Sequence, residues 1–101
     1  MTPFSTFYIL KAITTETGKS LEDIKQEKGV LRQMAMELLY RLGGLKGVEI
    51  GRILDVGYTS VSQERRRLHE RMQHDKKIVK FMHQLERKCK ALGTILWAEK
   101  R

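Results

Sequence analysis

The sequence predicts an all-α fold, a compact bundle of five to six helices. Apolar residues recur at spacings of three and four along most of the chain, as in helices that pack on one side. Glycines and residues that favour helix N-termini separate these stretches. No segment alternates apolar and polar residues long enough to build a sheet. These three observations together predict the all-α fold class.

The first two helices lie before Gly29. The first opens near Pro3 and ends at Gly18, which can adopt the left-handed conformation of a helix C-terminus. Its predicted apolar face comprises Phe4, Phe7, Tyr8, Leu10, Lys11 and Ile13. A short second helix begins after Ser20, which pairs with Asp23 three residues on as in a capping box.

The third helix has the clearest pattern and ends at Gly43. Its inward stripe is predicted to hold Leu31, Met34, Ala35, Leu38, Leu39 and Leu42. Four polar residues fall off that stripe, so we expect them to face solvent: Arg32, Gln33, Glu37 and Arg41.

Two further helices are predicted at residues 47–54 and 59–73, joined by Asp55, Val56 and Gly57. Such a pair with a short turn containing glycine is typical of a helix-turn-helix, here at about Gly47 to Gln73. The first helix needs a small residue near the crossing, and Gly51 stands there. An apolar wedge between the helices is supplied by Ile50, Leu54 and Val61. Gly57 is expected to take a left-handed conformation in the turn.

The last helix is predicted to start at Asp75 and to end at Gly93, so that residues 1–93 form the domain and residues 94–101 a tail. Its inward residues are expected to be Ile78, Val79, Met82, Leu85, Cys89 and Leu92. The apolar tail residues Ile95, Leu96 and Trp97 either pack back on the first helix or contact a parent protein or second subunit.

Length and composition exclude several classes of protein. The chain has 101 residues, which suits one domain and leaves little room for a nucleotide-binding catalytic domain with its own substrate pocket. No apolar run reaches the ~20 residues that span a bilayer, and no signal-peptide pattern opens the chain. A single cysteine excludes an internal disulfide and suits a reducing cytoplasm. We therefore expect a cytoplasmic domain that is not an enzyme and has no membrane partner.

Positive charge is concentrated in the C-terminal part. The formal net charge is +8, and residues 58–101 hold 12 basic against five acidic residues. Basic residues gathered on one region are typical of phosphate binding, although a solvated surface is the simpler alternative. Histidines and the cysteine do not form the two closely spaced pairs that structural zinc requires, so we expect no metal or other cofactor.

In a helix-turn-helix, the start of the second helix reaches base edges in the major groove of DNA. The polar residues in that position are Tyr58, Thr59, Ser60, Ser62 and Gln63. Hydroxyls and amides there can bond bases, and the next turn holds the cluster Arg65, Arg66 and Arg67. An ordinary solvated helix would more often balance such charges with acids four residues away.

These segments resemble the C-terminal DNA-binding domain of the bacterial replication initiator DnaA, a fold similar to that of the Trp repressor. The resemblance lies in three stretches: Arg32-Gln33-Met34-Ala35-Met36, Glu49-Ile50-Gly51-Arg52 and Tyr58-Thr59-Ser60-Val61. It covers about Phe4 to Cys89, and it implies that Arg32, Gln33 and Arg67 contact the DNA backbone while residues 58–60 face bases. Because Tyr58 stands where the family has histidine, the resemblance does not imply the family's own target sequence.

The sequence thus predicts a sequence-preferring double-stranded DNA-binding domain. Its expected backbone contacts are Arg32, Gln33, Lys46, Arg66 and Arg67. The chain has no Gly-rich phosphate loop, so a DNA-targeting module of a transposase or of a replication or regulatory protein fits better than a whole initiator. The rival interpretation is a protein-interaction module with a basic docking face. RNA binding is disfavoured because few aromatic residues are placed for base stacking.

Overall fold

The computed structural model describes residues 5–27 and 29–99, with side chains as far as Ala91. This part of the chain contains helices and no strand, which confirms the all-α class. The helices are α1 (Thr6–Thr17), α2 (Leu21–Gln26), α3 (Val30–Arg41), α4 (Gly47–Leu54), α5 (Tyr58–His74) and α6 (Lys76–Glu99). The radius of gyration is 13.2 Å, the value expected of a compact domain of this length.

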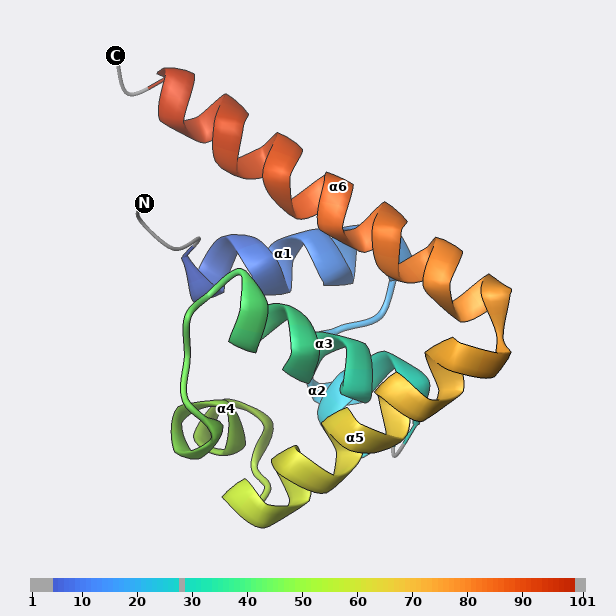
Figure 1. Ribbon diagram of the computed structural model, residues 1–101. Coiled ribbons are helices and arrows are strands. Elements are labelled where there is room, and N and C mark those ends of the chain that lie inside the picture. Colours follow the sequence, from blue (N-terminus) through green and yellow to red (C-terminus); the bar gives the residue numbers. More distant parts are fainter. Residues whose placement is uncertain (1–4, 28, 100–101) are drawn as a thin grey trace.

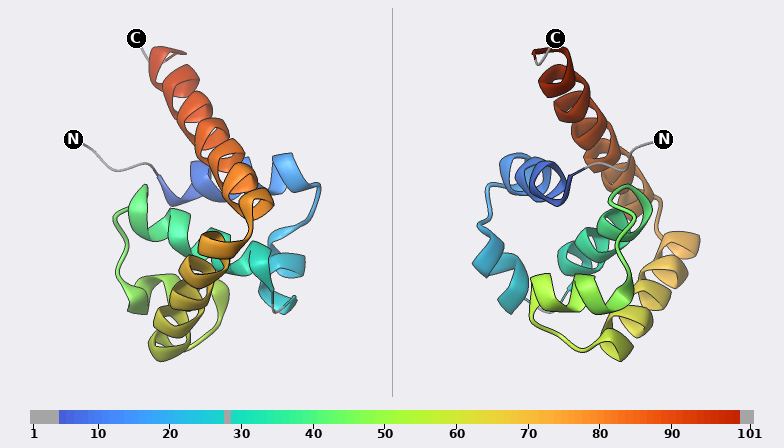
Figure 2. Two further views of the ribbon diagram at one scale, coloured as in Figure 1. Left: turned by 45° about the vertical axis from the view of Figure 1, so that its right-hand side comes forward. Right: turned by 90° about the vertical axis from the view of Figure 1, so that its left-hand side faces the viewer.

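Helix α3 occupies the middle of the molecule (Figure 1). It contacts α1, α2, α4 and α5, while α6 packs mainly along α1. In all views α6 lies at one end of the molecule, and α4 and the start of α5 lie at the other (Figures 1 and 2). The two ends of α5 are therefore in different surroundings: its first turns lie beside α4, and its last turn leads into α6.

The core is a single cluster of buried apolar side chains drawn from all six helices. Its fully or almost fully buried members are Ile9, Ala12, Ile13, Ile24, Met34, Ala35, Met36, Leu38, Leu39, Ile50, Leu54, Val61, Leu68, Met82, Leu85 and Cys89. Apolar burial of this kind is the main force that holds the helices together. The expected inward residues of α3 and α6 and the wedge residues of α4 and α5 are buried at most positions. Leu31 and Leu42 of α3 and Ile78 and Val79 of α6 are only partly buried, and the side chain of Leu92 lies outside the described residues.

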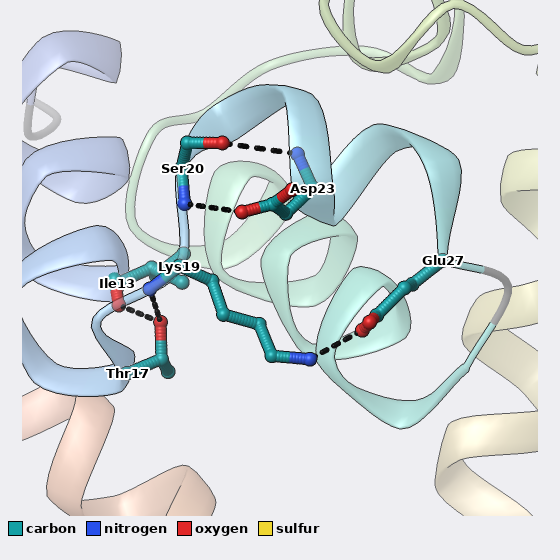
Figure 3. A network of polar contacts seen from close by, with 6 residues as sticks. All are labelled: Ile13, Thr17, Lys19, Ser20, Asp23 and Glu27. Atoms are coloured by element: carbon teal, nitrogen blue, oxygen red, sulfur yellow. Dashed lines mark hydrogen bonds and ion pairs between the residues drawn. The ribbon is translucent and has the colours of Figure 1, made fainter.

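The predicted helix boundaries around α2 are confirmed (Figure 3). Gly18 ends α1 in the left-handed conformation, with φ 72°. The Ser20 hydroxyl accepts a hydrogen bond from the Asp23 backbone N–H, and the Asp23 carboxylate accepts one from the Ser20 N–H, each at 3.2 Å. An ion pair between Lys19 and Glu27 spans the same helix. Local capping chemistry therefore fixes where this short helix begins.

The predicted apolar face of α1 is partly wrong. The buried residues are Ile9, Ala12 and Ile13, whereas Phe7 is 62% exposed and Lys11 lies over the Phe7 ring. Phe4 lies outside the described residues. Fewer residues of α1 are buried than predicted, and the helices that pack against α1 are α3 and α6.

Three polar residues of α3 that were expected to face solvent are buried: Arg32, Gln33 and Glu37. The reason is that α5 packs along this side of α3, and its charged side chains pair with Arg32 and Glu37. Arg41, the fourth, is exposed and pairs with Glu86 of α6.

The connection between α4 and α5 has the predicted length but a different geometry. Gly57 has an ordinary φ of −73°, and Asp55 takes the left-handed conformation instead, with φ 59°. An aspartate tolerates this region better than most residues with a side chain. Gly51 is required, because a Cβ there would collide with the carbonyl oxygen of Val56 in the turn. The need for a small residue is confirmed, and its cause is the turn.

Helix α6 continues to Glu99, so the prediction that the last helix ends at Gly93 is wrong. One glycine within a helix costs only about 1 kcal/mol relative to alanine, and its neighbours favour helix. The start is as predicted, since the Asp75 carboxylate accepts a hydrogen bond from the Lys77 N–H at 2.9 Å. The side chains of Ile95, Leu96 and Trp97 lie outside the described residues.

Candidate nucleic-acid interface

The first two turns of α5 form an open polar surface. Gly57 precedes the helix in an extended conformation, and Tyr58 begins it. All five residues predicted to contact bases are exposed: Tyr58, Thr59, Ser60, Ser62 and Gln63. Tyr58, at 64% exposure, is among the most exposed large side chains.

One side of the same turns is fixed to α4 by apolar packing. Val61 is 1% exposed, and Ile50 and Leu54 of α4 are fully buried, as the predicted wedge requires. The buried residues of α5 are Val61, Glu64 and Leu68, at the spacing of a single helix face. The exposed polar residues therefore project from a helix whose opposite face is held in place.

Arg32 binds a carboxylate of α5. Its guanidinium donates to both carboxylate oxygens of Glu64, at 2.8 and 2.9 Å, and to the carbonyl oxygen of Lys25 at 3.3 Å. The side chains of Arg32 and Glu64 are each 8% exposed. The prediction that Arg32 faces solvent is therefore wrong, and its guanidinium donors already have acceptors within the protein.

A second charged group joins α3 to α5 one turn further along. Glu37, almost fully buried, accepts hydrogen bonds from Arg65 at 2.9 Å and interacts with His69. The Arg65 guanidinium also lies 3.6 Å from the centre of the Tyr40 ring. Burial would raise the pKa of the Glu37 carboxyl, but hydrogen bonds from His69 and Arg65 and their positive charge lower the pKa overall. Arg65, expected in the basic cluster, is thus a structural residue.

The other two arginines of that cluster are not buried against α3. Arg66 and Arg67 are exposed, and neither takes part in an ion pair among the described residues. Arg71 is also exposed and lies one turn beyond Arg67. Arg71 was not among the predicted contacts to the DNA backbone, although its spacing of four from Arg67 places both residues on one side of α5.

A shallow groove of about 440 Å³ runs along this side of α5. Its walls include Ser60, Gln63, Arg67 and Arg71 from α5, with Gly29 and Gln33 from the start of α3. Gln33 is only 4% exposed, and its Oε1 is buried without a hydrogen-bond partner among the described residues. A buried amide oxygen without a partner is costly, so the groove has an unused acceptor in its wall. Gln33 thus lines the groove while its amide oxygen is buried in the wall.

Lys46 lies near the opposite edge of the polar surface. It is exposed and precedes the first residue of α4, and its backbone N–H donates to the Glu49 carboxylate at 3.1 Å. The next residue, Gly47, lies against Tyr58, because a Cβ at Gly47 would be 3.8 Å from the Tyr58 Cβ. The starts of α4 and α5 are therefore neighbours, which brings Lys46 to the same end of the molecule as the predicted base-contact residues.

The remaining chemistry-bearing residues form no site. No cluster of three or more potential metal ligands occurs within the part of the chain that the structure describes. Burial, and beside it the negative charge of Glu86, raise the pKa of the Cys89 thiol to about 11. Cys89 is therefore protonated at neutral pH and packs as a small apolar residue.

Among the helices of residues 5–27 and 29–99, none combines the length and apolar character needed to cross a membrane. No protein-family model, curated protein or solved structure matches this chain.

Proposed function

We propose that this chain is a sequence-preferring double-stranded DNA-binding domain. In this proposal α4 and α5 act as a helix-turn-helix, and the start of α5 enters the major groove. The observation that carries the proposal is that five polar side chains at the start of α5 are all exposed, while the opposite face of the same helix is anchored to α3 and α4. The resemblance to the DnaA C-terminal domain supports the same assignment.

Base reading is assigned to the first two turns of α5. Hydroxyl groups of Thr59, Ser60 and Ser62 and the amide of Gln63 can donate to and accept from base edges. The Thr59 methyl group can contact a thymine methyl. Tyr58, beside the start of α4, extends this surface toward Lys46.

Backbone contacts are assigned to Lys46, Arg66 and Arg67, and Arg71 is added to them. These cations flank the polar surface and are exposed, as groups that bind phosphates must be. Arg32 is withdrawn from this set and acts by holding α5 through Glu64. A contact from Gln33 remains part of the proposal through the groove that it lines.

The test is a binding measurement with salt titration. We expect the full chain to bind a fluorescent random-sequence duplex, with an affinity that falls as salt rises, by a log–log slope of about −0.9 for each phosphate contacted. Selection of bound duplexes from a random pool should then yield a preferred sequence. An absence of binding at moderate salt would contradict the proposal and favour a protein-interaction module.

The biological setting that we propose is a DNA-targeting module of a transposase or of a replication or regulatory protein. A small all-α chain with an exposed polar helix start and flanking arginines suits targeting, which needs no chemistry of its own. The preferred sequence from the selection, once located in a genome, would identify the process.

A further inference from the structure

A second basic surface lies on α6, outside the interface on α5. Five exposed residues follow one another at spacings of four and three: Lys76, Lys80, His83, Arg87 and Lys90. This spacing places them along a single line on a helix. Four of the five carry a permanent positive charge at neutral pH. We call these five residues the α6 stripe.

The α6 stripe is opposite the buried side of the same helix. Met82, Leu85 and Cys89 are fully buried, and they repeat with the same spacing half a turn away from the α6 stripe. The one carboxylate between Lys76 and Ala91, that of Glu86, pairs with Arg41 of α3. No acidic residue of this segment therefore neutralises the α6 stripe along its own helix.

The α6 stripe is remote from the proposed base-reading surface. The start of α5 and α6 lie at opposite ends of the molecule in every view (Figures 1 and 2). Helix α5 has 17 residues, so its first turn is about 25 Å from the turn into α6. The α6 stripe is therefore separate from the proposed base-reading surface.

We propose that the α6 stripe binds a second segment of double-stranded DNA, without sequence preference, so that one chain bridges two duplexes. This inference rests on the proposed function of α5. From Lys76 to Lys90 the α6 stripe is about 21 Å long at 1.5 Å per residue, which matches roughly six phosphates along one strand. Its cations are spaced about one helical turn apart, so they can follow a phosphate backbone.

Charge alone would also suit an anionic membrane, but the packing of α6 favours DNA. A helix that lies on a membrane inserts an apolar face among the lipids. Most apolar residues of α6 from Ile78 to Cys89 pack instead into or against the protein core: Ile78, Phe81, Met82, Leu85 and Cys89. A line of positive charge opposite a core-packed apolar face is the arrangement expected of a phosphate-backbone contact.

The experiment measures capture of a second duplex by the full chain. One selected duplex is attached to beads, the protein is added, and a fluorescent random-sequence duplex is then applied.

The test variant is Lys80→Gln/Arg87→Gln/Lys90→Gln. A matched control, Lys11→Gln/Lys19→Gln/Lys25→Gln, removes the same charge from α1, α2 and their connection. We expect the test variant to lose second-duplex capture by about 10-fold or more, and its salt slope to fall by about 3. The control should capture the second duplex like the original chain.

Each outcome bears on one proposal or the other. Normal capture by the α6 variant, including capture by a dimer through two α5 surfaces, would overturn the inference about α6. The inference about α6 would also be overturned if the original chain bound one duplex but captured no second one. It would likewise be overturned if the α6 variant lost binding to phosphatidylserine vesicles but kept duplex capture. The proposed function of α5 is tested separately, by measuring how the variant Thr59→Ala/Arg67→Gln binds the first duplex. If that variant binds the first duplex normally while the α6 variant does not bind it, α5 is not the interface.

Discussion

Arg65 and Arg67 are two residues apart on α5, and the protein uses them in opposite ways. Arg65 faces α3, where it binds the Glu37 carboxylate and stacks on the Tyr40 ring. Arg67 faces outward and lines the groove beside Ser60 and Gln63. The two sides of one helix thus divide the charged residues into those that hold α5 and those that are open to a partner.

This difference teaches how a basic cluster should be interpreted. A run of arginines predicts an anionic partner only for those members that lack an acidic partner in the fold. On the inner side, Glu64 and Arg32 satisfy each other, and Glu37 satisfies Arg65. On the outer side, neither Arg66 nor Arg67 forms an ion pair with a carboxylate among the described residues. The predictions below test this division of α5, beginning with the largest effect.

Glu64→Gln should destabilise the protein most. It leaves the Arg32 guanidinium buried without a countercharge, a change that typically costs about 3–5 kcal/mol. Urea denaturation followed by circular dichroism measures the free energy of unfolding. Arg32→Met/Glu64→Met is the control, because removing both charges should cost much less than removing one. A loss below about 1 kcal/mol for Glu64→Gln would show that the pair does not anchor α5.

Gly51→Ala should lower the free energy of unfolding by about 1–3 kcal/mol, since its Cβ would collide with the Val56 carbonyl oxygen. The matched control is Gly57→Ala, in the same turn. Gly57 has an ordinary φ and nothing within 4 Å of an added Cβ, so the change should be within about 0.5 kcal/mol. Equal effects of the two substitutions, read from thermal denaturation, would contradict the described path of the turn.

Arg65→Gln and Arg67→Gln should separate stability from binding. Arg65→Gln removes a hydrogen bond to a buried carboxylate and should cost about 1–2 kcal/mol of stability. Arg67→Gln should leave stability within about 0.5 kcal/mol and lower the salt slope of DNA binding by about 1. Chemical denaturation and fluorescence anisotropy measure the two quantities. The reverse pattern would show that the inner and outer sides of α5 are assigned wrongly.

Lowering the pH should destabilise the packing of α5 on α3 through protonation of Glu37. Because the folded pKa of its carboxyl lies below the ordinary pKa of a glutamate, its contribution to stability is fully present above that ordinary pKa. The contribution is lost as pH falls through the folded pKa. We expect the melting temperature to fall on acidification below about pH 4.5, and to fall less steeply in Glu37→Gln. Parallel pH profiles for the two proteins would contradict this role of Glu37.

Local sequence signals predicted much of this fold because the causes are themselves local. The capping box of Ser20 and Asp23, the left-handed Gly18 and the bounds of α4 depend on residues within a few positions of each other. The exposure of residues 58–60 follows likewise from their place at the start of a helix after a turn.

The errors come from contacts between residues far apart in the sequence. Arg32 and Glu37 look like solvent-facing residues when only α3 is considered. Their partners Glu64 and Arg65 are 28 to 32 positions away, and helical periodicity gives no information about such pairs. The predicted helix end at Gly93 was wrong because a single glycine ends a helix only weakly when no capping motif accompanies it.

The central claim is that the exposed start of α5 reads bases while its arginines hold the backbone. It is tested most directly by comparing Thr59→Ala with Arg67→Gln on a selected duplex and on a random one. We predict that Thr59→Ala costs about 1–3 kcal/mol on the selected duplex and much less on the random one. Arg67→Gln should weaken both duplexes alike. Equal losses on the two duplexes for Thr59→Ala would contradict the account.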